Sequence, residues 1–215
     1  MLTLIIGDKG SGKSLTAVRN ICIHKDKLAF TNFPLIGLKN FIRLREDDVI
    51  LPDGKGFTPN WDFWEKVQAK FKDFDIYIDE ISQIEMLNSK QHGGKSSVAG
   101  GKWVAQVRKA LGDSRSSNMY LICQNVEQLN ASWRRLVDCV VFCTKKEIKR
   151  KDGTVRTYIY LFTFKSSGLE HCMMLFDAFR AGAKSWNRKP YRFIAEPYFK
   201  YYSSKKFIRK EEGLL

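Results

Sequence analysis

Residues 7 to 14 of the chain read GDKGSGKS and directly follow the apolar run Leu2 to Ile6. They match the Walker A pattern, in which a glycine-rich loop between a strand and a helix ends in a lysine and a serine. Glycine lets the backbone N–H groups converge on phosphate oxygens, and the following helix adds the positive end of its dipole. We therefore expect nucleotide phosphates to bind at Gly7, Asp8, Lys9, Gly10, Ser11, Gly12, Lys13, Ser14 and Leu15.

Four side chains could supply the chemistry that such a loop serves. Lys13 carries a charge for the β and γ phosphates, and the Ser14 hydroxyl is suited to bind Mg²⁺. Asp79 ends a later apolar run, DIYID, where a Walker B carboxylate can complete the Mg²⁺ shell, and Glu80 follows it. A carboxylate in that place is the expected general base for an attacking water, although Glu80 could instead cap the next segment. Because water as nucleophile means hydrolysis, the pair favours an ATPase over a kinase.

Gln124 and a group of basic residues are candidate contacts to the γ-phosphate. Gln124 follows the apolar run Met119 to Cys123, and an amide at the carboxyl end of a strand can contact the γ-phosphate or the water. Ordinary loop hydrogen bonding is the alternative for this amide. The flanking segments carry Arg108, Lys109, Arg115, Arg134 and Arg135. An arginine that reaches a neighbouring subunit's γ-phosphate can raise the hydrolysis rate about 10³- to 10⁵-fold, and the sequence does not single one out.

Apolar periodicity predicts the helices and strands that hold these groups. Spacing near 3.6 residues predicts a helix from Lys13 to His24, and Asn60 can cap another from Trp61 to about Lys72. Further helices are expected at 103–111 and 133–136, and strands at 2–6, 28–33, 75–79, 119–123 and 137–143. This alternation predicts an α/β fold with a mostly parallel sheet and helices on both faces.

The last third of the chain has a different character. Asp152-Gly153 is a strong turn signal for an antiparallel hairpin at 147–156, and Thr157 to Phe164 alternates as a strand. From Lys184 to Lys210 basic residues alternate with aromatic rings, most of which we expect to pack on the core rather than stack on bases. We expect one P-loop ATPase domain over 1–215, with its core at about 1–144 and a hairpin and basic aromatic extension at about 145–215.

The charge balance favours polyanions as partners. The chain has 37 Lys and Arg against 23 Asp and Glu, a net charge of +14, which points to nucleic acid or an anionic membrane surface. It has no run of about 18 apolar residues and starts on a strand-like segment, so we expect a soluble intracellular protein. The Gly, Ser and Lys content of residues 88–102 predicts a mobile loop, which could project toward DNA.

The order of these pieces resembles a known family. The chain resembles the P-loop domain of the zonula occludens toxin (Zot)-like proteins of filamentous phages in the order of its motifs. These motifs are GDKGSGKS, LAFTNF, DIYIDE, LICQN, LNASWRRLVD and the terminal PYFKYYSS. The chain also resembles the wider FtsK/HerA-type group of viral packaging ATPases. The resemblance implies ATP and Mg²⁺ as cofactors, Lys13 and Ser14 on phosphate and metal, Asp79 and Glu80 as metal acid and base, and Gln124 as γ-phosphate sensor. It also places Arg134 or Arg135 at a loosely matched cationic contact. Thr31-Asn32 and PYFKYYSS are the features most particular to the Zot-like group.

The resemblance implies a P-loop NTPase fold of the ASCE, RecA-like class and an ATP-driven motor of virus assembly. The first interpretation is a homo-oligomeric ring that moves duplex viral DNA into a capsid, with capsid or portal-vertex proteins as partners. Zot-like proteins usually continue into a membrane-spanning helix, which this sequence lacks up to Leu215, and this departure favours the first interpretation. The second interpretation is extrusion of phage at a membrane, with the transmembrane part missing or supplied by a partner. Alternatives of another class are a small-molecule kinase and a non-catalytic, nucleotide-gated DNA-binding protein. The expected location is the host cytoplasm, with association with the virion as the alternative.

Overall fold

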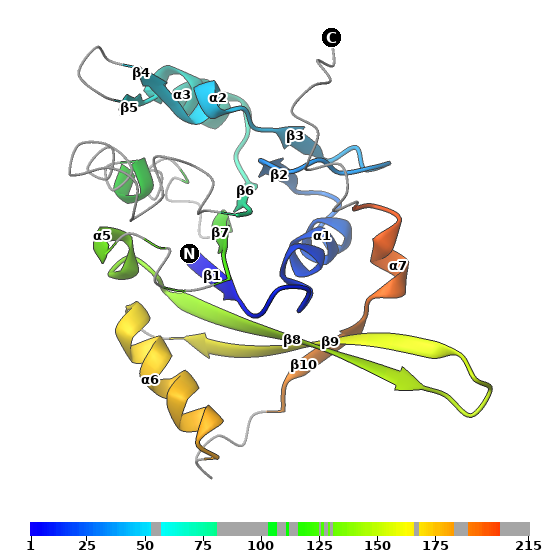
Figure 1. Ribbon diagram of the computed structural model, residues 1–215. Coiled ribbons are helices and arrows are strands. Elements are labelled where there is room, and N and C mark those ends of the chain that lie inside the picture. Colours follow the sequence, from blue (N-terminus) through cyan, green and yellow to red (C-terminus); the bar gives the residue numbers. More distant parts are fainter. Residues whose placement is uncertain are drawn as a thin grey trace.

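The computed structural model describes residues 1–52, 57–80, 103–106, 116–124, 131–165, 168–182 and 189–202, with Leu111, Val126 and Leu129. Its main strands are β1 (Leu2–Ile6), β2 (Leu28–Thr31), β3 (Phe41–Arg43), β6 (Phe74–Ile78), β7 (Asn118–Ile122), β8 (Cys139–Lys149), β9 (Val155–Lys165) and β10 (Tyr191–Ile194). They form an eight-stranded sheet in the order β10-β9-β8-β1-β7-β6-β2-β3 (Figure 1). The strands from β8 to β3 are parallel, and β9 is antiparallel to both of its neighbours.

The strand order sets the place of the site. β1 lies between β8 and β7, and β7 separates β1 from β6. Ile5 pairs with Ile122 of β7, while Leu121 of β7 pairs with Ile78 of β6. Since these strands are parallel, the segments that follow them emerge at one edge of the sheet, where open parallel sheets bind ligands.

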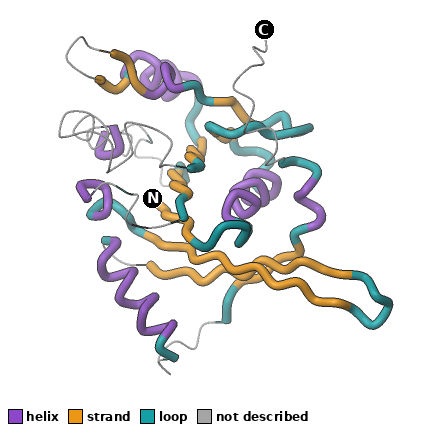
Figure 2. Tube along the Cα trace, in the orientation of Figure 1, coloured by secondary structure: helices purple, strands orange, loops and turns teal. Residues whose placement is uncertain are grey.

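Helices cover both faces of the sheet, as the sequence predicted. They are α1 (Lys13–Ile23), α2 (Glu46–Val49), α3 (Trp61–Lys70), α5 (Ala131–Arg134), α6 (Leu169–Arg180) and α7 (Glu196–Phe199). α1 and α7 lie on one side of the sheet, and α3, α5 and α6 on the other (Figures 1 and 2). Alternation along β1 accounts for this: Leu4 packs with α3, α5 and α6, while Ile5 packs with α1 and the C-terminal segment.

Several predicted bounds hold within two residues, including those of the helix that starts at Trp61. The Asn60 side chain accepts a hydrogen bond from the Phe63 N–H at 3.2 Å, as its capping role requires. Residues 103–106 of the expected helix at 103–111 are helical. Residues 107–110, and with them Arg108 and Lys109, lie outside the described residues, as do Arg115 and the loop predicted at 88–102.

The C-terminal third differs more from the sequence-based prediction. The strand expected at 137–143 continues to Lys149, so β8 is both a core strand and the first arm of the hairpin. The turn at Asp152-Gly153 is confirmed, with Gly153 at φ 82°. α6 was not predicted, although Leu169, Cys172 and Phe176 have helical spacing and pack on the sheet. An antiparallel pair, β4 (Ile50–Pro52) and β5 (Phe57–Pro59), lies outside the main sheet. Within the described residues, no helix has the length and apolar content needed to cross a bilayer.

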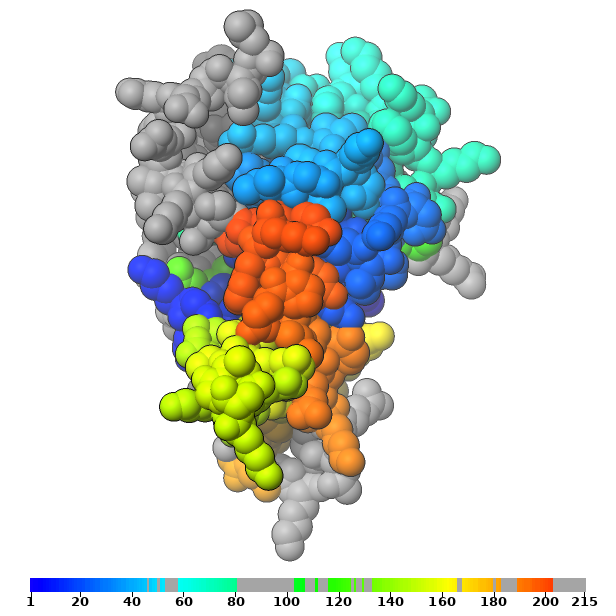
Figure 3. All heavy atoms as spheres, turned by 90° about the vertical axis from the view of Figure 1, so that its right-hand side faces the viewer, coloured from blue at the N-terminus to red at the C-terminus, as the bar shows by residue number. Residues whose placement is uncertain are grey.

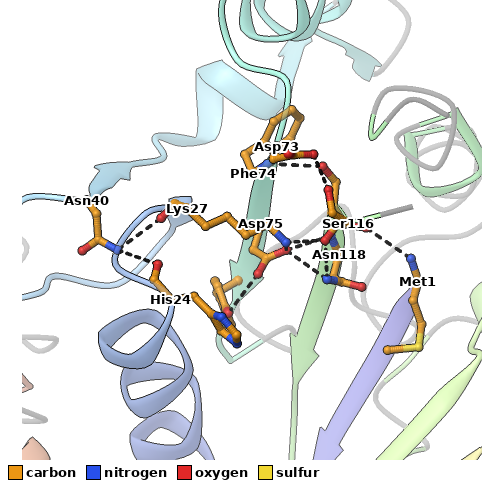
Figure 4. Close-up of polar contacts among 11 residues, drawn as sticks. Met1, His24, Lys27, Asn40, Asp73, Phe74, Asp75, Ser116 and Asn118 are labelled. Atoms are coloured by element: carbon orange, nitrogen blue, oxygen red, sulfur yellow. Dashed lines mark hydrogen bonds and ion pairs between the residues drawn. The ribbon is translucent and has the colours of Figure 1, made fainter. Parts of the chain in front are cut away.

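A buried polar cluster ties the strands together at the edge opposite the site (Figure 4). The Asp75 carboxylate, 3% exposed, accepts hydrogen bonds from Lys27 Nζ at 2.5 Å and from the Asn118 N–H at 2.8 Å. Lys27 also donates to the Ser116 carbonyl. Because a buried carboxylate is costly unless it is paired and hydrogen-bonded, these contacts hold the beginnings of β6 and β7 beside the turn before β2.

Candidate active site

The glycines of the phosphate loop allow a close approach of backbone that a side chain would block. Gly12, at φ 95°, precedes α1, and a Cβ there would lie 2.4 Å from Ile159 Cδ1. A Cβ on Gly7 would lie 2.4 Å from the Cys143 carbonyl oxygen. No side chain caps the start of α1, so its first N–H groups are available to an anion.

Lys13 lies folded over the beginning of the loop. It is 9% exposed, and its Nζ donates to the carbonyl oxygens of Gly7 and Asp8, each at 2.9 Å. Thr16 Oγ1 donates to the Gly12 carbonyl at 2.9 Å and so ties the loop to the first turn of α1. The ammonium is thus held at the beginning of the loop, where it can offer charge-assisted hydrogen bonds to phosphate oxygens.

Asp79 and Ser14 face each other beside the loop. Asp79 is 4% exposed, with the Ser14 hydroxyl and Lys13 near enough to act on its carboxyl, and the Glu80 N–H donates to its Oδ1 at 2.8 Å. Burial raises the pKa of the Asp79 carboxyl, and the nearby Ser14 hydroxyl, the Glu80 N–H and the charge of Lys13 oppose that rise.

The site has the donor set that Mg²⁺ needs. Mg²⁺ keeps several waters and takes one or two protein oxygens beside the phosphates, and Ser14 and Asp79 offer a hydroxyl and a carboxylate together. Ser11 Oγ within the loop is buried and has no hydrogen-bond partner, as expected for a group that meets a bound ligand. The residues present therefore fit a magnesium nucleotide.

Glu80 has an unusual backbone conformation. At φ 50° it is the one residue other than glycine with a positive φ in the part of the chain described. A left-handed conformation costs a residue with a side chain roughly 1–2 kcal/mol. Such strain is concentrated at functional sites, and here it occurs at the candidate general base, directly after the candidate metal ligand Asp79.

Asn32 is a site residue for which the sequence suggested no role. Its Nδ2 donates to the Asp79 carbonyl, and its Oδ1 accepts from the Asp79 N–H, both at 2.8 Å. The amide thus replaces a strand partner for Asp79 at the end of β6, next to β2. The sequence pointed to this residue only through Thr31-Asn32, a feature of the Zot-like resemblance. A polar residue after a strand does not indicate which other strand lies next to it, so the contact with Asp79 could not be predicted.

Gln124 lies beside the start of the phosphate loop. Together with Gly7, Asp8 and Phe176 it lines a cavity of about 320 Å³ between the loop and α6. The amide is exposed, so a water or a phosphate oxygen at the beginning of the loop can reach it. The structure thus brings Gln124 to the same edge as Lys13 and Asp79.

Arg134 and Arg135 lie away from the phosphate loop. They come at the end of α5, shortly before β8 begins at Cys139, which pairs with Thr3 near the start of β1. The phosphate loop follows the other end of β1. Arg134 Nε donates to the Leu129 carbonyl at 3.1 Å, and Arg135 is exposed. The topology separates both from this molecule's own loop.

No family model matches the chain, and no curated protein matches its sequence. Its fold is similar to that of the N-terminal domain of zonular occludens toxin from Neisseria meningitidis, with a TM-score of 0.50 and 15% identity over 90% of this chain and 92% of that chain. The genome packaging NTPase B204 from Sulfolobus turreted icosahedral virus 2, in complex with AMPPCP, gives a TM-score of 0.44 and 12% identity over 91% and 93% of the two chains. The likeness to the toxin domain confirms, at the level of the fold alone, the resemblance drawn from the motifs: a mostly parallel sheet with helices on both faces and an antiparallel hairpin.

Proposed function

We propose that this protein is an ATP-hydrolysing motor of virus assembly that moves duplex DNA into a capsid. The observation that carries the proposal is the convergence of Lys13, Ser14, Asp79 and Glu80 at the carboxyl edge of the sheet. A phosphate loop with a metal acid alone would suit a nucleotide switch. The adjacent second carboxylate is what supports hydrolysis.

Each group has a role that its position supports. Lys13 and the first N–H groups of α1 bind the β and γ phosphates, and Ser14 and Asp79 hold Mg²⁺, which when bound neutralises charge on the transferred phosphoryl group. Glu80 accepts the proton of the attacking water while the bond between the γ-phosphorus and the leaving ADP oxygen breaks. Gln124 contacts the γ-phosphate or that water.

The β8–β9 hairpin supports DNA as the partner. It extends beyond the body of the sheet in Figure 1. Its outer part is strongly basic, and Lys145 pairs with Glu147 at 3.0 Å. The cations of this part are Lys145, Lys146, Lys149, Arg150, Lys151 and Arg156, against the acids Glu147 and Asp152. Such an arm suits contact with the phosphate backbone.

The proposed assembly is a homo-oligomeric ring that acts in the host cytoplasm or on the virion, beside capsid or portal-vertex proteins. Since Arg134 and Arg135 are separated from their own phosphate loop, a γ-phosphate contact by either would have to be made in a neighbouring subunit. The ring supplies that neighbour.

Steady-state ATP hydrolysis tests the proposal. Wild type, Glu80→Gln and the control Glu65→Gln, an exposed residue of α3, are compared with and without duplex DNA at roughly 50 and 200 mM salt. We expect turnover in wild type and Glu65→Gln that DNA stimulates more strongly at low salt. Glu80→Gln should bind Mg-ATP without turning it over.

Other outcomes would overturn parts of the proposal. An ATP turnover rate that DNA does not change at either salt concentration would contradict a DNA motor and favour extrusion at a membrane. Co-sedimentation with lipid vesicles would then test the membrane interpretation. Transfer of the γ-phosphate to an added nucleoside or sugar would show a kinase. An absence of turnover with Mg-ATP bound would leave a nucleotide-gated DNA-binding protein.

A further inference from the structure

The C-terminal segment holds β9 from the side opposite β8. β10 pairs with β9, and α7 leads to Tyr201 and Tyr202. Figure 3 shows this segment, in orange to red, lying on the surface between the N-terminal part of the chain and the hairpin. Phe193 is buried in the core on the α1 side, and the rings of Tyr198, Tyr201 and Tyr202 pack against that core. The expected packing of the rings is confirmed for these four. β9 is thus held by a strand on each side where the hairpin leaves the sheet.

The projecting arm of the hairpin begins at two buried residues that lie against the phosphate loop (Figure 1). On β8, Cys143 is 0% exposed, and residues 144–149 beyond it are half-buried or exposed. On β9, Ile159 is 1% exposed, and residues 155–158 are likewise half-buried or exposed. A Cβ on Gly12 would lie 2.4, 3.0 and 3.3 Å from three side-chain carbons of Ile159, and one on Gly7 would lie 2.4 Å from the Cys143 carbonyl oxygen. The base of the arm therefore contacts both ends of the loop.

The first turn of α1 joins the same contacts. Thr16 Oγ1, which donates to the Gly12 carbonyl, lies 3.6 Å from Cys143 Sγ, and both atoms are buried. The loop is thus enclosed between its own helix and the base of the arm. Because a close-packed interior transmits displacement rather than absorbing it, movement of the arm at this base should move the loop, and movement of the loop should move the arm.

Ile159 stands in a row of three residues that crosses the hairpin and β10. It pairs with Lys145 of β8 on one side and with Phe193 of β10 on the other. Lys145 is exposed and begins the basic outer part of the arm, whereas Phe193 is buried. Ile159 is therefore the point at which the arm, the C-terminal segment and the phosphate loop meet.

We infer that Ile159 is a positioning residue of the phosphate loop, through which DNA on the hairpin and nucleotide on the loop change each other's affinity. The inference rests on the proposed function, because DNA is the partner proposed for the arm. Such an effect must be reciprocal: DNA changes the affinity for nucleotide by the same factor by which nucleotide changes the affinity for DNA. Cys143 meets Gly7 with a backbone oxygen, so Ile159 offers the side chain that a substitution can test.

Ile159→Val tests the inference because it removes Cδ1, the atom that a Cβ on Gly12 would meet first, and keeps a β-branched residue in the strand. Ile76→Val is the matched control, since Ile76 of β6 is 0% exposed and loses the same methyl group in the core on the other side of the sheet. Calorimetry measures the affinity for Mg-AMPPNP with and without duplex DNA. Fluorescence anisotropy measures the affinity for duplex DNA with and without Mg-AMPPNP, and thermal unfolding is recorded for all three proteins.

We expect both measurements on wild type to give one linkage factor of about 5-fold or more. Ile159→Val should remove most of this linkage, while its affinity for each ligand alone stays close to that of wild type. Ile76→Val should keep the wild-type linkage factor. The two variants should lower the melting temperature by similar amounts, because each loses one buried methyl group.

The outcomes separate the two proposals. If wild type binds no duplex DNA or no Mg-AMPPNP, the proposed function fails and the inference fails with it. If wild type binds both and neither ligand alters the affinity for the other, the inference alone is wrong. An unchanged linkage factor in Ile159→Val would also overturn it. So would an equal loss of linkage in Ile76→Val, since that result indicates a general loosening of the sheet.

Discussion

The side-chain amide of Asn32 is hydrogen-bonded to both the N–H and the C=O of Asp79, at 2.8 Å for each contact. The residue that directly follows β6 is therefore held by the side chain that directly follows β2, on the far side of β6 from β1 and its phosphate loop. A substitution at Asn32 should therefore shift the position of the proposed metal ligand Asp79 without removing a contact to the nucleotide.

Asn32→Asp should uncouple this clamp. The new carboxylate oxygen would face the Asp79 carbonyl in place of a donor, which should cost about 1–3 kcal/mol of stability. It should also weaken Mg²⁺ binding in the presence of AMPPNP by about 10-fold or more. Denaturant unfolding and Mg²⁺ titration measure the two effects.

Asn40→Asp is the control for this substitution. Asn40 Nδ2 donates to the carbonyls of Ile21, His24 and Lys27, away from the site. The Asn40→Asp variant should be less stable than wild type, while the Mg²⁺ concentration needed to reach the titration midpoint should be the same as for wild type. An equal shift of the Mg²⁺ titration in the two variants would contradict a functional role for the contact between Asn32 and Asp79.

The strain at Glu80 predicts opposite effects on stability and activity. Glu80→Gly removes the base and also relieves the φ of 50°, whereas Glu80→Ala removes the base and keeps the strain. Both should lower turnover by about 10²- to 10⁴-fold. Only the glycine variant should melt above wild type, by about 2–4 °C for each kcal/mol relieved. Equal melting temperatures of the two variants would show that the backbone is not strained.

The local pattern was enough to predict the phosphate loop but not every residue around it. Gly7 to Ser14 are contiguous, so their types and spacing carry the whole signal. Asn32 reaches the site through the strand order, which places β2 next to β6 and is not readable from adjacent residues. α6 was missed even though its spacing was present, because a short apolar run beside a glycine and two serines also fits a loop.

Asp79→Asn should stabilise the protein in the absence of metal. Burial raises the folded-state pKa of this carboxyl, so ionisation at neutral pH opposes folding, and the amide removes that cost. Wild-type stability should rise as the pH falls through the folded pKa toward the unfolded one, so the advantage of the variant should shrink in acid. Thermal unfolding without Mg²⁺, from neutral to acidic pH, measures this difference. A variant that is less stable at neutral pH, or whose advantage grows in acid, would contradict it.

The β8–β9 hairpin should carry part of the salt dependence of DNA binding. Lys149 and Lys151 are exposed near its turn, and replacing both by Gln should lower the slope of log K against log salt by about 0.9 for each DNA phosphate that the hairpin no longer neutralises. The control is Lys66→Gln with Lys72→Gln, two exposed lysines in and just after α3 with the same change in net charge.

Duplex DNA binding is measured by fluorescence anisotropy at several salt concentrations, and DNA-free ATP hydrolysis should be unchanged in both variants. If the two double variants changed the slope equally, net charge would account for binding and the hairpin would not be the contact. A smaller slope in the hairpin variant alone would place the DNA backbone against this arm, because counterions are released only where a cation meets a phosphate.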